Sequence, residues 1–202
     1  MRCVLNTFLA AIVLLSFSLS AFADVAVGEA APNFIIKDTH LKPVVLASYR
    51  GKFVVLEWFN VDCPFVKKHY GSGNMQRLQK TYTDKGVMWF SICSSAPGKQ
   101  GFYSAEEINK TMAQKGSQAT AVILDTRGEV GRLYGAQTTP HIFIIDPEGI
   151  LIYQGAIDSI PSTDPADIAN AQNYAASALD SAMADQPVSV SSTKSYGCSV
   201  KY

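Results

Sequence analysis

Apolar residues gather in short runs that predict alternating strands and helices. The run Phe53–Phe59 is almost continuously apolar, as expected of a strand that is buried on both faces. Val87–Cys93 repeats this pattern, and Ala121–Leu124 is a shorter run of the same kind. Two further runs, His141–Ile145 and Ile150–Gln154, flank the turn sequence Asp-Pro-Glu-Gly, which predicts an antiparallel hairpin.

Helix signals fill the intervals between these runs. Asp62 is the expected N-cap of the first helix, with Pro64 in its first turn and Gly-Ser-Gly interrupting it at 71–73. Further helices are predicted over 75–85, 104–115, 126–134 and 164–184, the last capped by Asp164. This alternation predicts an α/β domain in which helices cover both faces of a parallel sheet that ends in an antiparallel edge.

The N-terminus departs from this pattern. Arg2 precedes an apolar run at 9–15, and Ala21-Phe22-Ala23 satisfies the small-x-small cleavage rule, which together predict a secretory signal peptide over 1–23. A membrane anchor is the alternative, but the apolar run is short and is followed by serines. We therefore expect a periplasmic or secreted protein.

Composition limits the function classes. Removal of residues 1–23 leaves enough chain for one domain over 24–185, followed by a serine-rich, extended tail over 186–202. The chain holds 17 basic and 17 acidic residues, without the clustered lysines and arginines that a nucleic-acid surface requires. We expect no nucleic-acid partner, and no membrane partner after cleavage.

The cysteines introduce candidate chemistry. The expected mature chain keeps Cys63, Cys93 and Cys198, an odd number that is small for a disulfide scaffold and favours a reactive thiol. Cys63 follows the first buried strand at the start of a helix, where free N–H groups and the helix dipole stabilise a thiolate. Lys67, one turn later, is expected to add positive charge nearby.

Several phrases resemble a known family. A buried strand, then Cys63-Pro64 at a helix start, then Thr139-Pro140 before a hairpin follow the order of the thioredoxin fold. The phrases at 27–34, 49–52 and 143–149 resemble the peroxiredoxin-like branch, the alkyl hydroperoxide reductase and thiol-specific antioxidant (redoxin) group. Residues 58–70, 94–101 and 196–198 resemble an exported thioredoxin-family subgroup.

The resemblance implies a thioredoxin-like fold with a central mixed sheet, and cofactor-independent thiol oxidoreductase activity. The substrate would be a hydroperoxide or the thiol or disulfide of another protein, and an external thiol would be the reductant. Pro140 is expected to form a cis peptide bond beside the reactive cysteine. Thr139 would then present its backbone to an extended substrate, with Pro64 also at the substrate site.

The sequence departs from both parent patterns. Val66 stands where a thioredoxin has the second cysteine of Cys-x-x-Cys, and the residues before Cys63 lack the Pro and hydroxyl typical of peroxiredoxins. Cys63 therefore needs a remote resolving thiol. We predict Cys198 for this role, because the tail also offers apolar anchors, with Cys93 as the runner-up. Cys93 has an alternative role in the core, and Cys198 the alternative of a disordered terminus.

Two other functions stay open at this point. His69 and His141 raise the possibility of a copper-binding module, since cysteine with histidine binds copper or zinc. The ligand spacing for such a site is absent, and His69 is expected to face solvent beside two lysines, so we predict no metal. The last alternative is a redox-inert interaction protein that has lost Cys-x-x-Cys.

Overall fold

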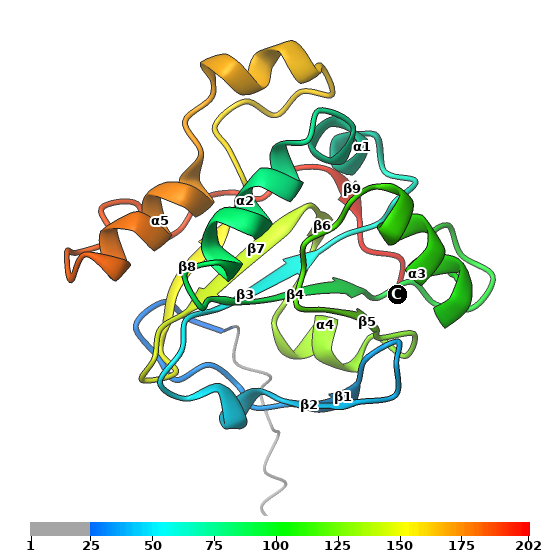
Figure 1. Cartoon of the computed structure of the whole chain (residues 1–202), viewed down its shortest axis with the longest axis horizontal. Helices are drawn as coiled ribbons and strands as arrows, with labels where there is room; N and C mark the ends of the chain where they lie inside the picture. The colour runs from blue at the N-terminus through cyan, green and yellow to red at the C-terminus, as the bar shows by residue number, and fades with distance from the viewer. Residues whose placement is uncertain (1–24) are drawn as a thin grey trace, which may run out of the picture.

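The computed structural model describes residues 25–202, so the predicted signal peptide lies outside the described residues. A five-stranded sheet in the order β5-β4-β3-β7-β8 forms its centre (Figure 1). β3, β4 and β5 run parallel, whereas β7 is antiparallel to β3 and to β8. The expected mixed sheet is confirmed. Its strands span Val54–Trp58 (β3), Met88–Cys93 (β4), Ala121–Leu124 (β5), His141–Ile145 (β7) and Leu151–Gly155 (β8).

Helices cover both faces of this sheet, as predicted. One face packs against α1 (Pro64–Gly71), α2 (Asn74–Thr83), α3 (Ala105–Gln114) and α5 (Tyr174–Met183) (Figure 1). The other packs against α4 (Glu129–Leu133), the 3-10 helix η1 (Leu46–Tyr49) and a small antiparallel pair, β1 (Ile35–Lys37) and β2 (Pro43–Val45). The hydrophobic pattern did not predict this pair, because three residues are too few to show a period.

The first helix, α1, begins one residue later than the predicted cap indicated. Cys63, not Asp62, is the N-cap of α1. Asp62 lies in the preceding turn, where its N–H donates to Asn60 Oδ1 at 2.9 Å and its carboxylate accepts from the Tyr103 hydroxyl at 2.7 Å. Because those bonds hold Asp62 outside the helix, Cys63 itself occupies the N-cap position of α1.

The predicted helix over 164–184 is two helices. Asp164 caps the 3-10 helix η2 (Pro165–Asn170) as expected, but the backbone then turns extended at Ala171. Asn173 caps a new helix, α5, by accepting from the Ala176 N–H at 2.8 Å. The Asn173 cap therefore begins a second, separate helix after the extended residue Ala171.

One carboxylate of the core, that of Glu57, is completely buried. Glu57 in β3 is fully buried on the face towards α1 and α2. Burial raises the pKa of its carboxyl, and four side-chain donors oppose that effect. Those donors are Tyr70, Gln79, Trp89 and Ser91, at 2.8 to 3.1 Å. Glu57 therefore ties β3 to α1, α2 and β4 directly behind the turn that carries Cys63.

The C-terminal tail is extended, as predicted, and is bound along the domain. The strand β9 (Cys198–Ser199) pairs antiparallel with β6 (Thr138–Thr139) (Figure 1). Tyr202 donates its hydroxyl to the Ala136 carbonyl at 2.7 Å, and the Thr193 hydroxyl accepts from the Ala156 N–H at 2.9 Å. Anchors on both sides of Cys198 thus fix this part of the chain.

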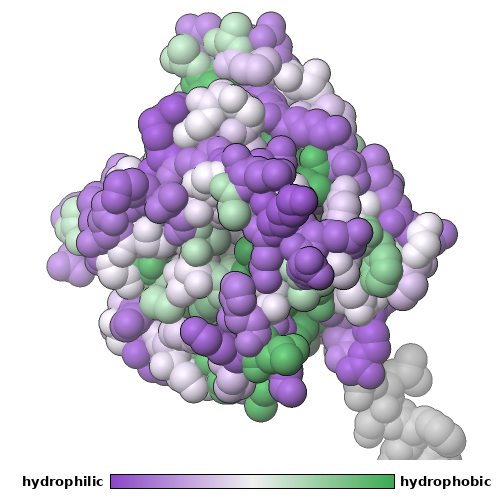
Figure 2. Space-filling model, turned by 45° about the vertical axis from the view of Figure 1, so that its right-hand side comes forward, coloured by the Kyte–Doolittle hydropathy of each residue, from purple (hydrophilic) through white to green (hydrophobic). Residues whose placement is uncertain are grey.

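The face drawn in Figure 2 shows no large apolar patch. The face seen in Figure 2 is largely hydrophilic, with apolar side chains in small separate patches. Within residues 25–202, no helix has the length and apolar character needed to cross a membrane. The candidate chemistry lies at the edge of the sheet where β3 and β4 end.

Candidate active site

Cys63 sits at the N-terminus of α1, one short turn after β3. Pro64 occupies the first helical position, where its fixed φ suits the helix and its missing N–H costs nothing. The Cys63 side chain is fully buried, and its Sγ donates to the Thr139 carbonyl at 3.1 Å. The bond between Thr139 and Pro140 is cis, as predicted. Cys63 and the Thr139-Pro140 turn therefore meet across the sheet.

The C-terminal strand brings Cys198 to the same place. In the β6–β9 pair, Cys198 lies directly opposite Thr139, and the Thr139 hydroxyl donates to the Cys198 carbonyl at 3.5 Å. The Cys198 side chain also lies close enough to Cys63 to lower the pKa of the Cys63 thiol. Both cysteines are free thiols. The structure thus brings together Cys63, Thr139 and Cys198, from three separate parts of the sequence.

Gly197 makes this approach possible. Its φ of +130° lies in a region that side-chain-bearing residues rarely adopt. A Cβ at this position would lie 2.1 Å from the Thr139 carbonyl oxygen, the same atom that accepts the Cys63 thiol. Only glycine lets the tail pass so close to the site. In the sequence, Gly197 was noted only as part of the segment 196–198, and no local pattern indicated its close approach to Thr139.

The two thiols differ in acidity. Burial raises the pKa of the Cys63 thiol, but hydrogen bonds from Cys198, Thr139 and the Val66 N–H outweigh burial and bring that pKa below its usual 9.0. Burial and the neighbouring Cys63 raise the pKa of Cys198 to about 11. Cys63, at the helix N-terminus, is therefore the more acidic of the two thiols, and Cys198 is the less acidic.

This arrangement predicts a pH effect on Cys63 alkylation. Because Cys198 donates to the thiolate, Cys198→Ala should raise the midpoint of the rate–pH profile above that of the wild type. The profile can be measured by iodoacetamide labelling and peptide mass spectrometry. Cys93→Ala is the matched control and should leave the midpoint in place. A midpoint that is unchanged or lowered in Cys198→Ala would contradict the assigned donor.

The other predicted site residues have different surroundings. Cys93 is buried at the end of β4, and its Sγ donates to the Gly101 carbonyl at 3.3 Å and to the Ser95 hydroxyl at 3.5 Å. Burial raises its pKa, so Cys93 is the less reactive thiol. Lys67 is exposed, as is Pro64, and Lys67 is not among the groups that shift the pKa of Cys63. The predicted effect of the Lys67 charge on Cys63 is therefore not found; hydrogen bonds lower the pKa of the Cys63 thiol instead.

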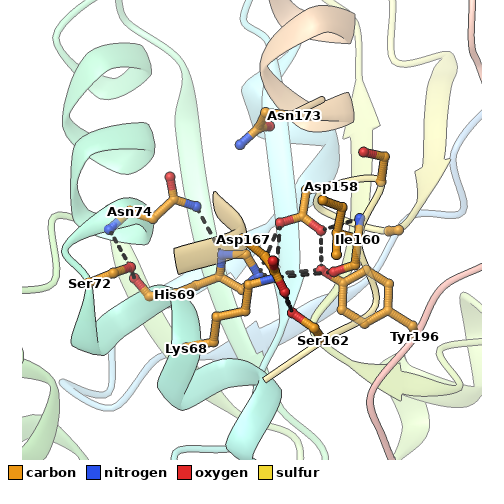
Figure 3. A network of polar contacts seen from close by, with 12 residues as sticks. Lys68, His69, Ser72, Asn74, Asp158, Ile160, Ser162, Asp167, Asn173 and Tyr196 are labelled. Atoms are coloured by element: carbon orange, nitrogen blue, oxygen red, sulfur yellow. Dashed lines mark hydrogen bonds and ion pairs between the residues drawn. The ribbon is translucent and has the colours of Figure 1, made fainter. Parts of the chain in front are cut away.

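His69 does not face solvent, contrary to the prediction from the sequence. Instead of facing solvent, its side chain is fully buried and its Nδ1 accepts from the Asn74 amide at 2.9 Å (Figure 3). Burial lowers its pKa to about 4, so it is neutral at pH 7. Neighbouring Lys68 is also buried, pairing with Asp158 at 3.5 Å and donating to the Ile160 carbonyl at 3.1 Å. The segment 158–170 covers this side of α1, which the local charge pattern could not indicate.

Histidines and cysteines do not form a metal site here. Among residues 25–202, no group of three or more His, Cys, Asp or Glu side chains is arranged to hold a metal ion. His141 is buried in β7, with its Nδ1 accepting from the Gln137 N–H at 3.3 Å. Its pKa is lowered to about 4 by burial.

Comparison with known proteins assigns the chain to a family. The AhpC/TSA family pattern matches residues 27–154, and the chain therefore belongs to the AhpC/TSA family of redoxin-type thiol oxidoreductases with a thioredoxin-like fold. It is 27% identical to the thiol-disulfide oxidoreductase ResA of Bacillus thuringiensis over 63% of this chain and 68% of that protein. It is 29% identical to a thioredoxin peroxidase of Echinococcus granulosus over 67% of this chain and 72% of that one.

A solved structure extends the likeness to nearly the whole chain. An uncharacterized conserved protein from Geobacillus kaustophilus is 26% identical and superposes with a TM-score of 0.73, covering 89% of this chain and 94% of its own. That coverage is larger than the span matched by the family pattern, which ends at residue 154. The tail that carries Cys198 lies beyond that span.

Proposed function

We propose that the protein is an exported thiol oxidoreductase whose redox pair is Cys63 and Cys198. The observation that carries the proposal is the β6–β9 pairing, which sets Cys198 opposite the residue whose carbonyl accepts the Cys63 thiol. The lowered pKa of Cys63 and the raised pKa of Cys198 support the roles of attacking and resolving thiol. Export rests on the N-terminal sequence pattern.

The preferred substrate is a hydroperoxide. The Cys63 thiolate attacks the distal peroxide oxygen, and the O–O bond breaks to give a Cys63 sulfenic acid and an alkoxide or hydroxide, which takes a proton from solvent and leaves as alcohol or water. The Cys198 thiol then attacks the Cys63 sulfur, forming a disulfide and releasing water. An external thiol returns two electrons and restores both thiols. The chain supplies the positioned thiolate, the donor beside it and the resolving sulfur.

The occupied edge of β6 favours such a small oxidant. An extended protein substrate would be expected to pair with the Thr139 backbone, but β9 already pairs there. A peptide would have to displace the chain's own tail along the whole of β6, whereas a hydroperoxide needs only a small opening to the buried Cys63 sulfur. The likeness to a thioredoxin peroxidase agrees with this preference. Thiol–disulfide exchange is the second candidate, favoured by the likeness to ResA.

A comparison of two substrates tests the proposal. We expect the purified protein to consume hydrogen peroxide with a thiol reductant faster than it reduces insulin disulfides. Cys63→Ser should lower peroxide consumption by roughly 100-fold or more, because the nucleophile is lost. Cys198→Ser should stop at the sulfenic acid, and Cys93→Ser is the matched control with activity kept. Faster insulin reduction would favour exchange, and activity that survives Cys63→Ser would overturn the proposal.

A further inference from the structure

A buried polar network lies against α1, the helix that begins at Cys63. Asp158 follows β8, and its carboxylate accepts from the Ile160 N–H at 3.1 Å and pairs with Lys68 of α1 at 3.5 Å (Figure 3). Asp158 and Lys68 are both almost completely buried. A buried carboxylate of this kind needs partners around it, and the network supplies a cation and several donors.

The tail contributes one member to this network. The Tyr196 hydroxyl donates to Oδ1 of Asp158, and its ring packs edge-on against Phe65 of α1 with the centroids 5.8 Å apart. Tyr196 is therefore held at both ends, its ring by α1 and its hydroxyl by a buried carboxylate. In Figure 3 its side chain points from the tail towards Asp158 and the His69–Lys68 side of α1.

The tail and the helix are thus joined at two neighbouring points. α1 carries Cys63 at its N-cap and Lys68 five residues later, whereas the tail carries Tyr196 and, two residues further, Cys198. Gly197, between the two tail residues, passes directly against the Thr139 carbonyl. The position of the Cys198 sulfur is therefore coupled to the position of the Tyr196 hydroxyl.

We propose that Asp158 and Tyr196 are positioning residues that fix the C-terminal strand so that Cys198 is held against Cys63. This inference rests on the proposed redox pair. A hydrogen bond from a hydroxyl to a buried charged group is among the stronger ones in proteins. By holding the strand in one place, it raises the effective concentration of the Cys198 thiol at the Cys63 sulfur.

Tyr196→Phe is the sharpest variant for the test. It removes one hydroxyl and leaves Asp158 paired with Lys68, so no buried charge loses its counter-ion. Asp158→Asn would instead leave Lys68 without its carboxylate, and it serves only as a second variant. Tyr202→Phe is the matched control, because Tyr202 also anchors the tail through its hydroxyl, on the other side of Cys198.

The experiment equilibrates the wild type and both phenylalanine variants with glutathione buffers and measures the Cys63–Cys198 disulfide by peptide mapping. We expect Tyr196→Phe to lower the equilibrium constant for that disulfide about tenfold, and Tyr202→Phe to change it less than about twofold. Thermal unfolding of each variant reports global stability separately. An equilibrium constant in Tyr196→Phe equal to that of the wild type would overturn the positioning role while leaving the redox pair intact.

A second readout separates this inference from the proposed function. If Tyr196 positions Cys198, Tyr196→Phe should also raise the pH midpoint of Cys63 alkylation, since the Cys198 donor is then held less firmly. That shift does not require a disulfide to form. A wild type without a bridge would refute the redox pair, whereas an unshifted midpoint in Tyr196→Phe would refute the positioning role.

Discussion

Replacement of Gly197 by alanine is expected to slow formation of the Cys63–Cys198 disulfide by roughly 100-fold or more, because it removes the resolving thiol from its place. The alanine Cβ would lie 2.1 Å from the Thr139 oxygen and 2.8 Å from the Thr139 carbonyl carbon. Both are backbone atoms of β6 and cannot turn aside as a flexible side chain can. The φ of +130° adds strain for any residue with a Cβ. The strand β9 must therefore leave β6, and Cys198 leaves with it.

The rate can be followed by one-equivalent peroxide pulses, acid quenching and peptide mapping. Gly71→Ala is the matched control, since Gly71 ends α1 and a Cβ there would meet nothing within 4 Å. We expect that control to form the bridge at the wild-type rate. Sulfenic acid at Cys63 should accumulate in Gly197→Ala, because the first step does not use the tail. An unchanged bridging rate in Gly197→Ala would mean that the tail does not resolve Cys63 from this position.

Replacement of Glu57 by leucine is expected to lower the free energy of unfolding by about 3 to 5 kcal/mol. The buried carboxylate accepts four side-chain hydrogen bonds, and leucine accepts none. Trp89 and Ser91 would then be left buried with donors that cannot reach water. Gln79 also donates to the Tyr70 hydroxyl at 3.0 Å, which limits the loss. The strand β3 and the start of α1 should loosen together.

Urea unfolding at pH 7 measures this effect. Glu106→Leu is the control, because Glu106 is exposed in the first turn of α3 and makes only a small helix-dipole contribution, roughly 0.3 to 1 kcal/mol. Glu57→Gln keeps the shape and should fall between the two. A loss in Glu57→Leu no larger than that in Glu106→Leu would show that the four donors find other partners.

The central sheet could be predicted because its strands are buried on both faces and therefore read as apolar runs. The same pattern hid Glu57, the one charged residue in the run Phe53–Phe59, whose presence inside a buried strand was itself a signal of a polar network. β1 and β2 are too short for a periodic pattern. Lys68 and His69 have the sequence of a solvated helix face, and only the packing of a segment some 90 residues away buries them.

The candidate site was predictable in part for similar reasons. Cys63 follows a buried strand at a helix start, and this local pattern marks it without knowledge of the tertiary structure. The pairing of Thr139 with Cys198 spans 59 residues and leaves no local trace. Cys198 could be chosen only from the odd cysteine count and the apolar anchors of the tail. Its contact with Cys63, the role of Gly197 and the Asp158–Tyr196 contact all depend on how distant segments pack.

The most direct test of the redox pair is non-reducing peptide mapping of the wild-type protein after oxidation with one equivalent of hydrogen peroxide. The structure sets Cys198 opposite Thr139, whose carbonyl accepts from the Cys63 thiol. We predict an intramolecular disulfide between Cys63 and Cys198, with Cys93 recovered as a free thiol. A Cys63–Cys93 disulfide, or an oxidised protein without any bridge at Cys63, would contradict the account.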